Sequence, residues 1–348
     1  MKQLRVGIIG AGGIAQACHM PAYQELAGVT LHAVADINPE TAQRAAQRFQ
    51  VPHVFQDYRD LVAMDEIDLV SVCTPNAFHK DPTIAALRAG KHVLVEKPMA
   101  LNAAEGRAMI RAAQQAGKLL MVGLNNRFSA AAQALKRAAD AGALGEVYFA
   151  EAIATRRRGI PGWGAFTEKE KSGGGALVDI GVHVLDLTLY LMGYPKPVSV
   201  SGMVAAKFGP RVDLPAVEGG WRWDPRRFDV DDFGVGFVRF GNGASLVLKT
   251  SWAGNIGDQA FNSILWGTEG GCRFSPPAIY RQEHGSLVDV TPVELPEVRS
   301  HHVEVQRFVD AIRKGQPSPV PPEEPLVTQQ ILDAIYGSSE TGKEVKLS

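Results

Sequence analysis

The chain has 348 residues, of which 45% are hydrophobic and 21% are charged. At about 150 residues per domain, this length predicts two domains, and the composition excludes a disordered or fibrous chain. The 36 basic and 37 acidic residues give a net charge of −1. Because nucleic-acid binding calls for a basic face, we expect no nucleic-acid partner.

The cysteines and the apolar segments favour the cytoplasm as the expected location. The three cysteines are widely spaced and form neither a disulfide framework nor a CxxC metal motif, which is typical of a reducing compartment. The most apolar helical stretch, Ala176 to Met192, contains three ionisable residues, so we expect no membrane span. The N-terminal sequence has no apolar stretch long enough for a signal peptide.

The first third of the chain alternates short apolar runs with helical stretches. Strands are expected at Leu4–Ile9, Leu31–Ala35, His53–Phe55, Leu69–Cys73, His92–Val95 and Leu119–Val122. Helices are expected at Ile14–Leu26, Pro39–Phe49, Tyr58–Ala63, Pro82–Ala89 and Ala103–Gln115. Strands joined through helices predict a parallel sheet with right-handed crossovers over residues 1–123.

The pattern changes after Gly123, and residues 124–348 are expected to form a second domain. A helix is expected at Phe128–Ala141, and two more at His301–Lys314 and Glu323–Ser339. Strands are expected at Val147–Thr155, Val198–Ala205, Val230–Phe240, Ser245–Trp252, Asn262–Trp266 and Gly271–Phe274. Short links such as Gly241-Asn242-Gly243 predict hairpins and therefore an antiparallel sheet. The C-terminal helix can pack back on the first domain.

The segment Gly10–Ala15 matches the pattern G-x-G-x-x-G/A between a predicted strand and a predicted helix. Gly10 permits the tight turn, Gly12 lets a pyrophosphate approach the main chain, and Ala15 keeps the helix close to the strand. The start of the helix offers N–H groups to the phosphates. The alternative for the motif alone is an ordinary glycine turn. In this context we expect a dinucleotide to contact Gly10, Gly12, Gly13 and Ile14.

Asp36 ends the second predicted strand and favours NAD over NADP. Its carboxylate can accept hydrogen bonds from both ribose hydroxyls and would repel a 2′-phosphate, and neither Ile37 nor Asn38 supplies the positive charge that NADP requires. The alternative role for Asp36 is a helix cap, although Asn38 before Pro39 fits that role better.

Two motifs stand at the ends of predicted parallel strands, where the ligands of such sheets bind. One is Glu96-Lys97-Pro98, in which the proline keeps the lysine out of the helical region. The other is Thr74-Pro75-Asn76 with His79. The alternatives are an exposed lysine and a helix start capped by Asn76.

Asp179 and His183 are four residues apart on an otherwise apolar helix, with Asp186 on nearly the same stripe. A buried carboxylate and imidazole are unfavourable unless they bind each other or a ligand. Hydride transfer from an alcohol needs a base for the hydroxyl proton and a carboxylate that fixes the tautomer of that base. A structural Asp–His hydrogen bond is one alternative. A metal site is another, but zinc usually takes more nitrogen or sulfur ligands, so we expect no metal.

Together these residues resemble the glucose–fructose oxidoreductase / inositol dehydrogenase / rhizopine catabolism (Gfo/Idh/MocA) family over nearly the whole chain. The matching segments are Gly10–Ala15, Thr74-Pro75-Asn76 with His79, Glu96-Lys97-Pro98, Asn126-Arg127-Phe128 and Asp179-x-Gly181-x-His183. The resemblance implies an α/β protein with an N-terminal Rossmann domain and a C-terminal α+β domain with an open, mostly antiparallel sheet. It also implies oxidation or reduction of a sugar, cyclitol or related polyol, and a homodimer or homotetramer formed through that sheet.

The resemblance also implies roles for single residues. Lys97 hydrogen-bonds the reacting oxygen, His183 is the acid/base, and Asp179 orients it or binds a neighbouring hydroxyl. Arg127 lines the substrate pocket, with a surface or helix-capping arginine as the alternative. Cofactor contacts on the strand ends are expected from Thr74, Pro75, Asn76, His79, Glu96 and Lys97.

The loop from Arg156 to Trp163 reaches the crevice in this family. Trp163 can stack on a sugar face and an arginine can grip an anionic group, although a solvated basic loop with a packed tryptophan is an equal alternative. Trp221 and Trp223 in the next long loop carry the same ambiguity.

Three functions are compatible with these motifs. The first is an NAD-dependent sugar or polyol dehydrogenase. The second is a glycoside hydrolase or lyase in which bound NAD oxidises the sugar transiently. The third is a non-catalytic NAD-binding sensor, which would not need Lys97, Asp179 and His183.

Overall fold

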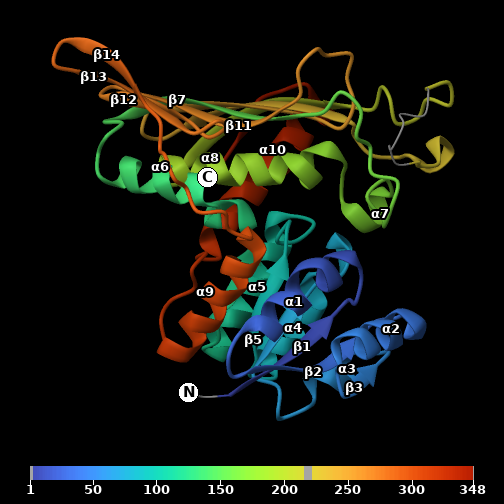
Figure 1. Cartoon of the computed structure of the whole chain (residues 1–348). Coiled ribbons are helices and arrows are strands. Elements are labelled where there is room, and N and C mark those ends of the chain that lie inside the picture. Colours follow the sequence, from blue (N-terminus) through green and yellow to red (C-terminus); the bar gives the residue numbers. More distant parts are fainter. Residues whose placement is uncertain (1–2, 215–221, 348) are drawn as a thin grey trace. The chain divides into compact units, whose positions relative to one another are not determined.

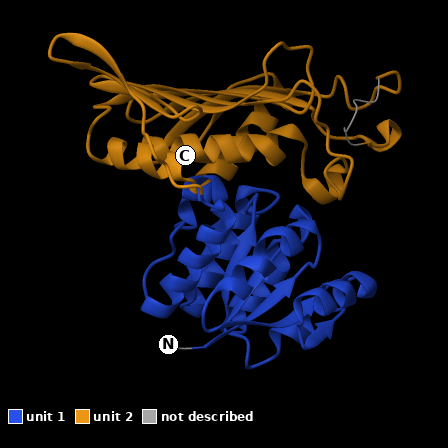
Figure 2. Ribbon diagram, in the orientation of Figure 1, with its two compact units in different colours: residues 1–128, 298–326 blue, residues 129–297, 327–348 orange. Residues whose placement is uncertain are grey.

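The computed structural model describes residues 3–214 and 222–347 and divides into two compact units (Figure 2). The first unit comprises residues 1–128 and 298–326, and the second comprises residues 129–297 and 327–348. Each unit is therefore built from two separate stretches of chain and has its own hydrophobic core.

The first unit is built on a six-stranded parallel sheet. Its strands are β1 (Leu4–Ile9), β2 (Val29–Ala35), β3 (His53–Phe55), β4 (Leu69–Val72), β5 (His92–Glu96) and β6 (Leu120–Gly123). The order β3-β2-β1-β4-β5-β6 is that of a dinucleotide-binding doubly wound sheet. β4 in the middle of the sheet and β6 at its edge are buried at every residue, because helices cover both faces of such a sheet. The predicted Rossmann fold is confirmed.

The helices of the first unit follow the predicted pattern, with one helix added from residues 298–326, a segment that was expected in the second domain. They are a π-helical turn (Ala15–His19), α1 (Met20–Glu25), α2 (Pro39–Phe49), α3 (Tyr58–Val62), α4 (Lys80–Arg88), α5 (Ala103–Ala116) and α9 (Ser300–Lys314), with 3₁₀ turns at Asn76–Phe78 and Asn125–Phe128. The π-helical turn stands where a regular helix was expected, directly after the glycine loop. π-Helical turns are rare and often occur at functional sites.

The second unit contains a nine-stranded mixed sheet that is mostly antiparallel, as predicted. Its strands are β7 (Val147–Thr155), β8 (Pro197–Ala205), β9 (Phe233–Phe240), β10 (Ser245–Ser251), β11 (Ala260–Gly267), β12 (Gly270–Arg273), β13 (Ala278–Glu283), β14 (Ser286–Val290) and β15 (Val345–Lys346). Their order is β14-β13-β12-β11-β7-β10-β9-β8-β15. The first strand, β7, thus lies in the middle, parallel to β10 and antiparallel to β11.

The hairpin predicted at Gly241–Gly243 joins β9 to β10. The hairpin of β13 and β14 was not predicted. Its turn, His284-Gly285, has positive φ at both residues, which is the conformation of a tight two-residue hairpin loop. Histidine is uncommon in that conformation, so the turn carries a weaker sequence signal than Asn-Gly.

Helices cover one face of this sheet. They include α6 (Ala130–Asp140), α8 (Val182–Met192) and α10 (Glu323–Thr341), which lie against the same face (Figure 1). Shorter helices are α7 (Lys169–Ser172), a π-helical turn (Leu177–Gly181) and a 3₁₀ turn (Pro225–Arg227). Along β7, Ala150, Ala152 and Ala154 are buried while the alternate residues are half-buried, as expected for a sheet with one covered face.

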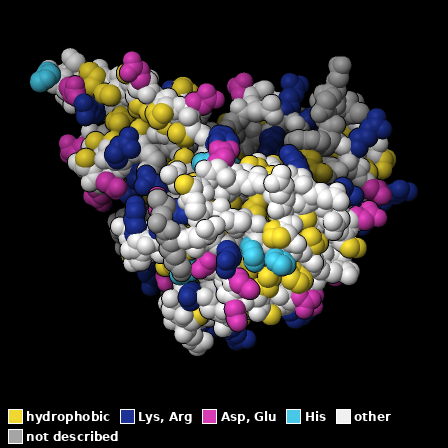
Figure 3. Space-filling view, turned by 60° about the horizontal axis from the view of Figure 1, so that its bottom comes forward, with side chains coloured by type: hydrophobic (Ala, Val, Ile, Leu, Met, Phe, Trp, Pro, Cys, Tyr) yellow, Lys and Arg dark blue, Asp and Glu magenta, His cyan; other side chains and the backbone are white. Residues whose placement is uncertain are grey.

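The segment Lys169–Met192 is long and apolar enough to cross a bilayer by composition alone. Most of it is buried inside the second unit, as expected for a core helix. Lys and Arg side chains are interspersed with Asp and Glu over the face shown in Figure 3, in keeping with the near-neutral net charge.

Candidate active site

The glycine loop has the shape of a phosphate cradle. Gly10 has a φ of +87°, and a Cβ on it would lie 2.7 Å from the carbonyl carbon of Cys73. Positions 12 and 13 face open space, because nothing lies within 4 Å of where a Cβ would be on either glycine. The loop therefore packs tightly where it leaves β1 and stays open where a pyrophosphate would approach, so these residues fit a dinucleotide.

Asp36 is fixed at the end of β2 beside this loop. Its two carboxylate oxygens accept hydrogen bonds from the main-chain N–H groups of Ala11, at 2.8 Å, and Asn38, at 2.9 Å. Asn38 caps α2 as predicted, accepting from two main-chain N–H groups. The residue after Asp36 is Ile37, which is 85% exposed and carries no charge.

The segment after β4 is held by internal contacts. The Thr74 hydroxyl donates to the carbonyl oxygen of Phe78 at 2.8 Å. His79 is fully buried, and its ring nitrogens lie 2.8 Å and 2.9 Å from the carbonyl oxygens of Pro98 and Thr74. Burial lowers the pKa of His79. His79 therefore ties the end of β4 to the end of β5.

Glu96 and Lys97 stand at the end of β5. Glu96 is buried, and its carboxylate accepts the main-chain N–H of Lys97 at 3.2 Å. Burial alone would raise the pKa of Glu96, but the hydrogen bond from His19 and the positive charges of His19 and Lys97 lower it to about 2. Glu96 is thus a buried carboxylate at neutral pH. The peptide bond between Lys97 and Pro98 is cis.

Arg127, predicted to line the substrate pocket, is 98% buried inside the first unit and forms an ion pair with Glu324, near the start of α10. The pair joins the 3₁₀ turn after β6 to the later segment of the same unit.

The helix that carries Asp179 and His183 is anchored at its start by Asp231. The Asp231 carboxylate accepts the main-chain N–H groups of Gly175, at 2.8 Å, and Leu177, at 2.9 Å, and the Tyr336 hydroxyl at 2.6 Å. Glycines are required here, because a Cβ on Gly174 would lie 2.0 Å from the Tyr336 hydroxyl and one on Gly175 would lie 1.7 Å from the Asp231 carbonyl oxygen.

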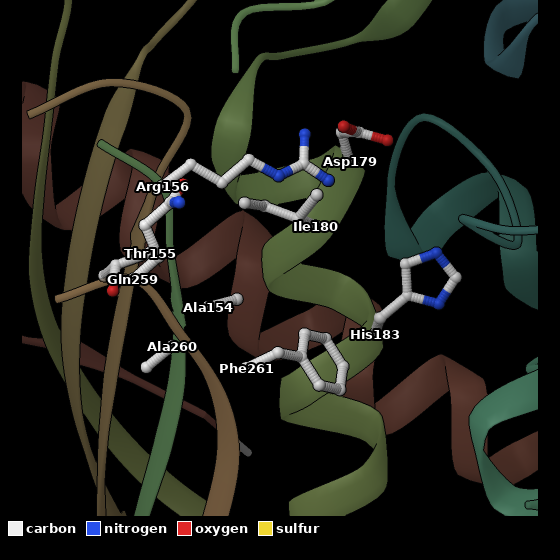
Figure 4. Close-up of a pocket in the computed structure, with 9 residues that line it drawn as sticks. All are labelled: Ala154, Thr155, Arg156, Asp179, Ile180, His183, Gln259, Ala260 and Phe261. Carbon is white, nitrogen blue, oxygen red and sulfur yellow. The ribbon is translucent and has the colours of Figure 1, made fainter. Parts of the chain in front are cut away.

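An open pocket of about 440 Å³ lies beside this helix, within the second unit (Figure 4). Asp179 and His183 project from the same side of the helix, as their spacing predicts. The pocket is lined by residues of β7 and the loop after it, of this helix, and of the start of β11: Ala154, Thr155, Arg156, Asp179, Ile180, His183, Gln259, Ala260 and Phe261. A carboxylate, an imidazole and a guanidinium thus share one pocket.

Asp179 is held in place by a buried tryptophan that the sequence did not single out for this role. The indole N–H of Trp252, which is fully buried just after β10, donates to the Asp179 carboxylate at 2.9 Å. A carboxylate has about four acceptor positions on its two oxygens. The contact joins residues 73 positions apart, and no local pattern indicates it.

Asp186, the third member of the predicted ionisable stripe, does not line this pocket. It is buried and accepts a hydrogen bond from the hydroxyl of Tyr194. Within residues 3–214 and 222–347, no three His, Cys, Asp or Glu side chains are grouped so as to hold a metal ion.

The long loops of the second unit differ in how much they contribute to the lining of the pocket. Arg156 lines the pocket, whereas Arg158 donates to the carbonyl oxygen of Gly254 and the side chain of Asn255. Trp163 is 46% exposed and packs edge-to-face on Phe166. Trp223 donates its indole N–H to the carbonyl oxygen of Gly209 at 2.7 Å. Trp221 lies outside the described residues.

Comparison with known proteins gives a separate match for each part of the chain. Residues 4–124 match the family described as "Oxidoreductase family, NAD-binding Rossmann fold". Residues 132–273 match the "GFO/IDH/MocA C-terminal domain". The N-terminal match confirms NAD as the cofactor type expected from the glycine loop.

Individual proteins match along most of their length. The chain is 36% identical to D-glucoside 3-dehydrogenase of Escherichia coli (strain K12), over 99% of this chain and 97% of that protein. It is 30% identical to levoglucosan dehydrogenase of Pseudarthrobacter phenanthrenivorans, over 79% and 74%. A solved structure of levoglucosan dehydrogenase in complex with NADH and levoglucosan gives a TM-score of 0.86 at 25% identity, over 99% of both chains.

Proposed function

The chain belongs to the Gfo/Idh/MocA oxidoreductase family, and from that premise we propose that it is an NAD-dependent dehydrogenase of a secondary hydroxyl on a sugar or related polyol. The observation that carries the proposal is the presence of Asp179 and His183 on the wall of one pocket. Its volume of about 440 Å³ is within the usual range for small-molecule sites, roughly 300–1,000 Å³.

The side chains divide the chemistry as follows. His183 accepts the hydroxyl proton, and the Lys97 ammonium stabilises the negative charge that develops on the oxygen. Asp179, fixed by Trp252, accepts hydrogen bonds from neighbouring hydroxyls. When bound, NAD⁺ supplies the acceptor for the hydride that leaves the carbon. General acid–base help of this kind is worth about 10²–10⁴ in rate.

Asp36 supports a preference for NAD over NADP. Its carboxylate is fixed beside the glycine loop by two main-chain N–H groups, where a 2′-phosphate would meet a negative charge. The double variant Asp36→Ser, Ile37→Arg is expected to shift the ratio of kcat/KM for NAD⁺ and NADP⁺ toward NADP⁺ by at least about tenfold. An unchanged ratio would assign coenzyme choice to other residues.

The substrate we propose is a hexopyranoside oxidised at its 3-hydroxyl, by likeness to the D-glucoside 3-dehydrogenase that matches along almost the whole chain. The experiment is a panel of methyl glucosides, levoglucosan, inositols and free aldoses with NAD⁺ and with NADP⁺. NADH formation is followed at 340 nm, and the ketone position is identified by NMR. Stoichiometric NADH with a 3-keto glycoside is the expected result.

Other outcomes of the same panel contradict this proposal. Cleavage of the glycosidic bond without net NADH would identify a hydrolase or lyase that oxidises the sugar transiently. NAD⁺ binding without turnover of any compound would identify a sensor.

We also propose that two copies associate through the uncovered face of the nine-stranded sheet. The outward residues of its strands include partly or fully exposed apolar side chains: Phe149, Ile153, Met203, Val235, Phe237, Val247, Ile264 and Trp266. Glu151, Arg239 and Lys249 lie among them on the same face. Exposed apolar side chains gathered on one face, with polar residues between them, are typical of a protein interface. Light scattering is expected to give a dimer or tetramer, and Phe237→Glu with Trp266→Glu is expected to give a smaller species.

A further inference from the structure

A series of buried polar side chains runs through the first unit and ends at the main chain of Lys97. The Tyr23 hydroxyl lies 2.8 Å from the Ser71 hydroxyl, which lies 3.2 Å from Nδ1 of His19. Nε2 of His19 lies 2.7 Å from Oε1 of Glu96, and Oε2 of Glu96 accepts the main-chain N–H of Lys97 at 3.2 Å. Tyr23, Ser71 and His19 are fully buried, and Glu96 is 93% buried.

These contacts join elements that are far apart in sequence. His19 is the last residue of the π-helical turn that follows the glycine loop. Glu96 is the last residue of β5 and directly precedes Lys97. The His19–Glu96 contact therefore links the helix of the cofactor loop to the strand end that presents the lysine.

The pair is charged. Burial by itself would lower the pKa of His19, but its interactions with Cys73 and Glu96 raise it well above the usual value. His301 and Glu304 also act electrostatically on the pair. A buried ion pair seldom stabilises a protein more than apolar side chains of the same size would. Fold stability is therefore a poor explanation for this pair at this place.

We propose that His19 and Glu96 are positioning residues for Lys97. Glu96 holds the main-chain N–H of the lysine with one oxygen, and His19 fixes Glu96 through the other. The lysine thereby leaves β5 in one main-chain conformation, which presents its ammonium group to the reacting oxygen. This inference rests on the proposed function, because that function gives Lys97 its role.

The test compares two neutral replacements of one residue that differ by a single methylene group. His19→Gln can place an amide N–H near the position of Nε2 and keep the donor to Glu96. His19→Asn is shorter and reaches only the position of Nδ1, on the Ser71 side. Glu96→Gln keeps the shape but removes the charge. His92→Asn, at the other end of β5, is the matched histidine control.

We expect His19→Asn and Glu96→Gln each to lower kcat at least about tenfold, with KM for NAD⁺ changed less than about twofold. His19→Gln restores most of the lost kcat. The double variant His19→Asn, Glu96→Gln loses no more kcat than the worse single variant, because both changes break the same contact between His19 and Glu96. His92→Asn retains the kcat of the unchanged protein.

A second measurement does not depend on turnover. In protein labelled with ¹⁵N-lysine, hydrogen exchange of the Lys97 amide, identified by its loss in Lys97→Arg, is expected to accelerate at least about tenfold in His19→Asn and Glu96→Gln and to stay unchanged in His92→Asn. Full turnover in Lys97→Ala would refute the role of Lys97 in the proposed function. The exchange measurement would still test whether His19 and Glu96 position the main chain of Lys97.

Two results would overturn the inference. One is an unchanged Lys97 exchange rate in both His19→Asn and Glu96→Gln. The other is a rise in KM for NAD⁺ that accounts for the whole loss of kcat/KM in His19→Asn, since that pattern means the pair only stabilises the glycine loop. If His19→Asn does not fold, Glu96→Gln decides by the same criteria.

Discussion

The end of β5 in the first unit and the pocket of the second unit both present ionisable side chains, but the two regions support them differently. Lys97 is backed by buried charged groups, with a carboxylate whose pKa is about 2 directly behind its main chain. Asp179 and His183 stand on an apolar helix, and the indole of Trp252 holds Asp179 from behind.

The comparison suggests a division of labour between the two units. Under the proposed function, the buried polar side chains of the first unit position Lys97 whichever sugar is bound, and the pocket of the second unit supplies the side chains that would contact the sugar. Changes behind Lys97 should therefore lower turnover for every substrate, whereas changes around Asp179 should alter the affinity for particular sugars. The following experiments test this difference, from the largest expected effect to the smallest.

The largest effect is expected from removing the reacting groups. Lys97→Ala and His183→Ala should each lower kcat by about 10²–10⁴, because each removes charge stabilisation or proton transfer in the transition state. Affinity for NAD⁺, measured by fluorescence titration, should stay within about twofold for His183→Ala. Lys314→Ala, an exposed lysine at the end of α9, is the control. Full turnover in either active-site variant would remove that residue from the mechanism.

A smaller effect is expected from removing the hydrogen bond between Trp252 and Asp179. Trp252→Phe removes the indole donor to the carboxylate, and a hydrogen bond to a charged group is worth roughly 1.5–3 kcal/mol. We expect KM for the sugar to rise at least about tenfold, with a smaller change in kcat. Tyr148→Phe, at an exposed tyrosine of the same sheet, also removes an aromatic hydrogen-bond donor and should leave KM unchanged. An equal effect of both variants would show that the orientation of Asp179 does not matter.

A variant of Arg127 distinguishes between a structural role for this side chain and a contact with the substrate. Arg127→Met leaves Glu324, whose side chain is 30% exposed, without this ion pair. The loss of a hydrogen bond to a charged group costs roughly 1.5–3 kcal/mol of unfolding free energy. We expect that loss in urea denaturation, with KM for the sugar within about twofold. Arg137→Met, an exposed arginine on α6, is the control. A raised KM at unchanged stability would instead support the substrate contact that the family resemblance implies.

The smallest effect is expected in the pH dependence of stability, to which the buried carboxyl group of Glu304 contributes. Burial, followed by the charge of Glu96, raises the pKa of Glu304 well above its usual value, while His19 and Arg127 act in the opposite direction. Above the pKa of the unfolded state, the unfolded chain releases this proton and the folded chain retains it. Stability is therefore lost as the pH rises above the usual glutamate pKa, up to the raised pKa of the folded state. Glu304→Gln removes this loss, so the Tm of the unchanged protein should fall relative to the variant over that range. A constant Tm difference would contradict this assignment.

Motifs at the ends of strands were the most predictable features from the sequence. The glycine loop, Asp36 and Glu96-Lys97-Pro98 all follow short apolar runs, and parallel strands bring their carboxyl ends to one edge of a sheet. The capping role of Asn38 was also predictable, because its side chain acts within one turn.

Features that depend on distant contacts were not predictable. The support of Asp179 by Trp252 and of the helix start by Asp231 and Tyr336 joins segments 56 to 105 residues apart. The π-helical turns were also missed, because a residue pattern that repeats every 3 or 4 residues fits a regular helix equally well. The buried setting of Arg127 depends in the same way on a residue 197 positions later.

The interleaving of the two units has a consequence for biosynthesis. α9 packs against α1 in the first unit, and β15 pairs with β8 at the edge of the second, so the last 50 or so residues complete both units. A nascent chain that has emerged only to residue 290 would display an unfinished apolar surface on each half. Such contacts between distant segments slow folding. We therefore expect this chain to fold late in translation and to need chaperone protection until then.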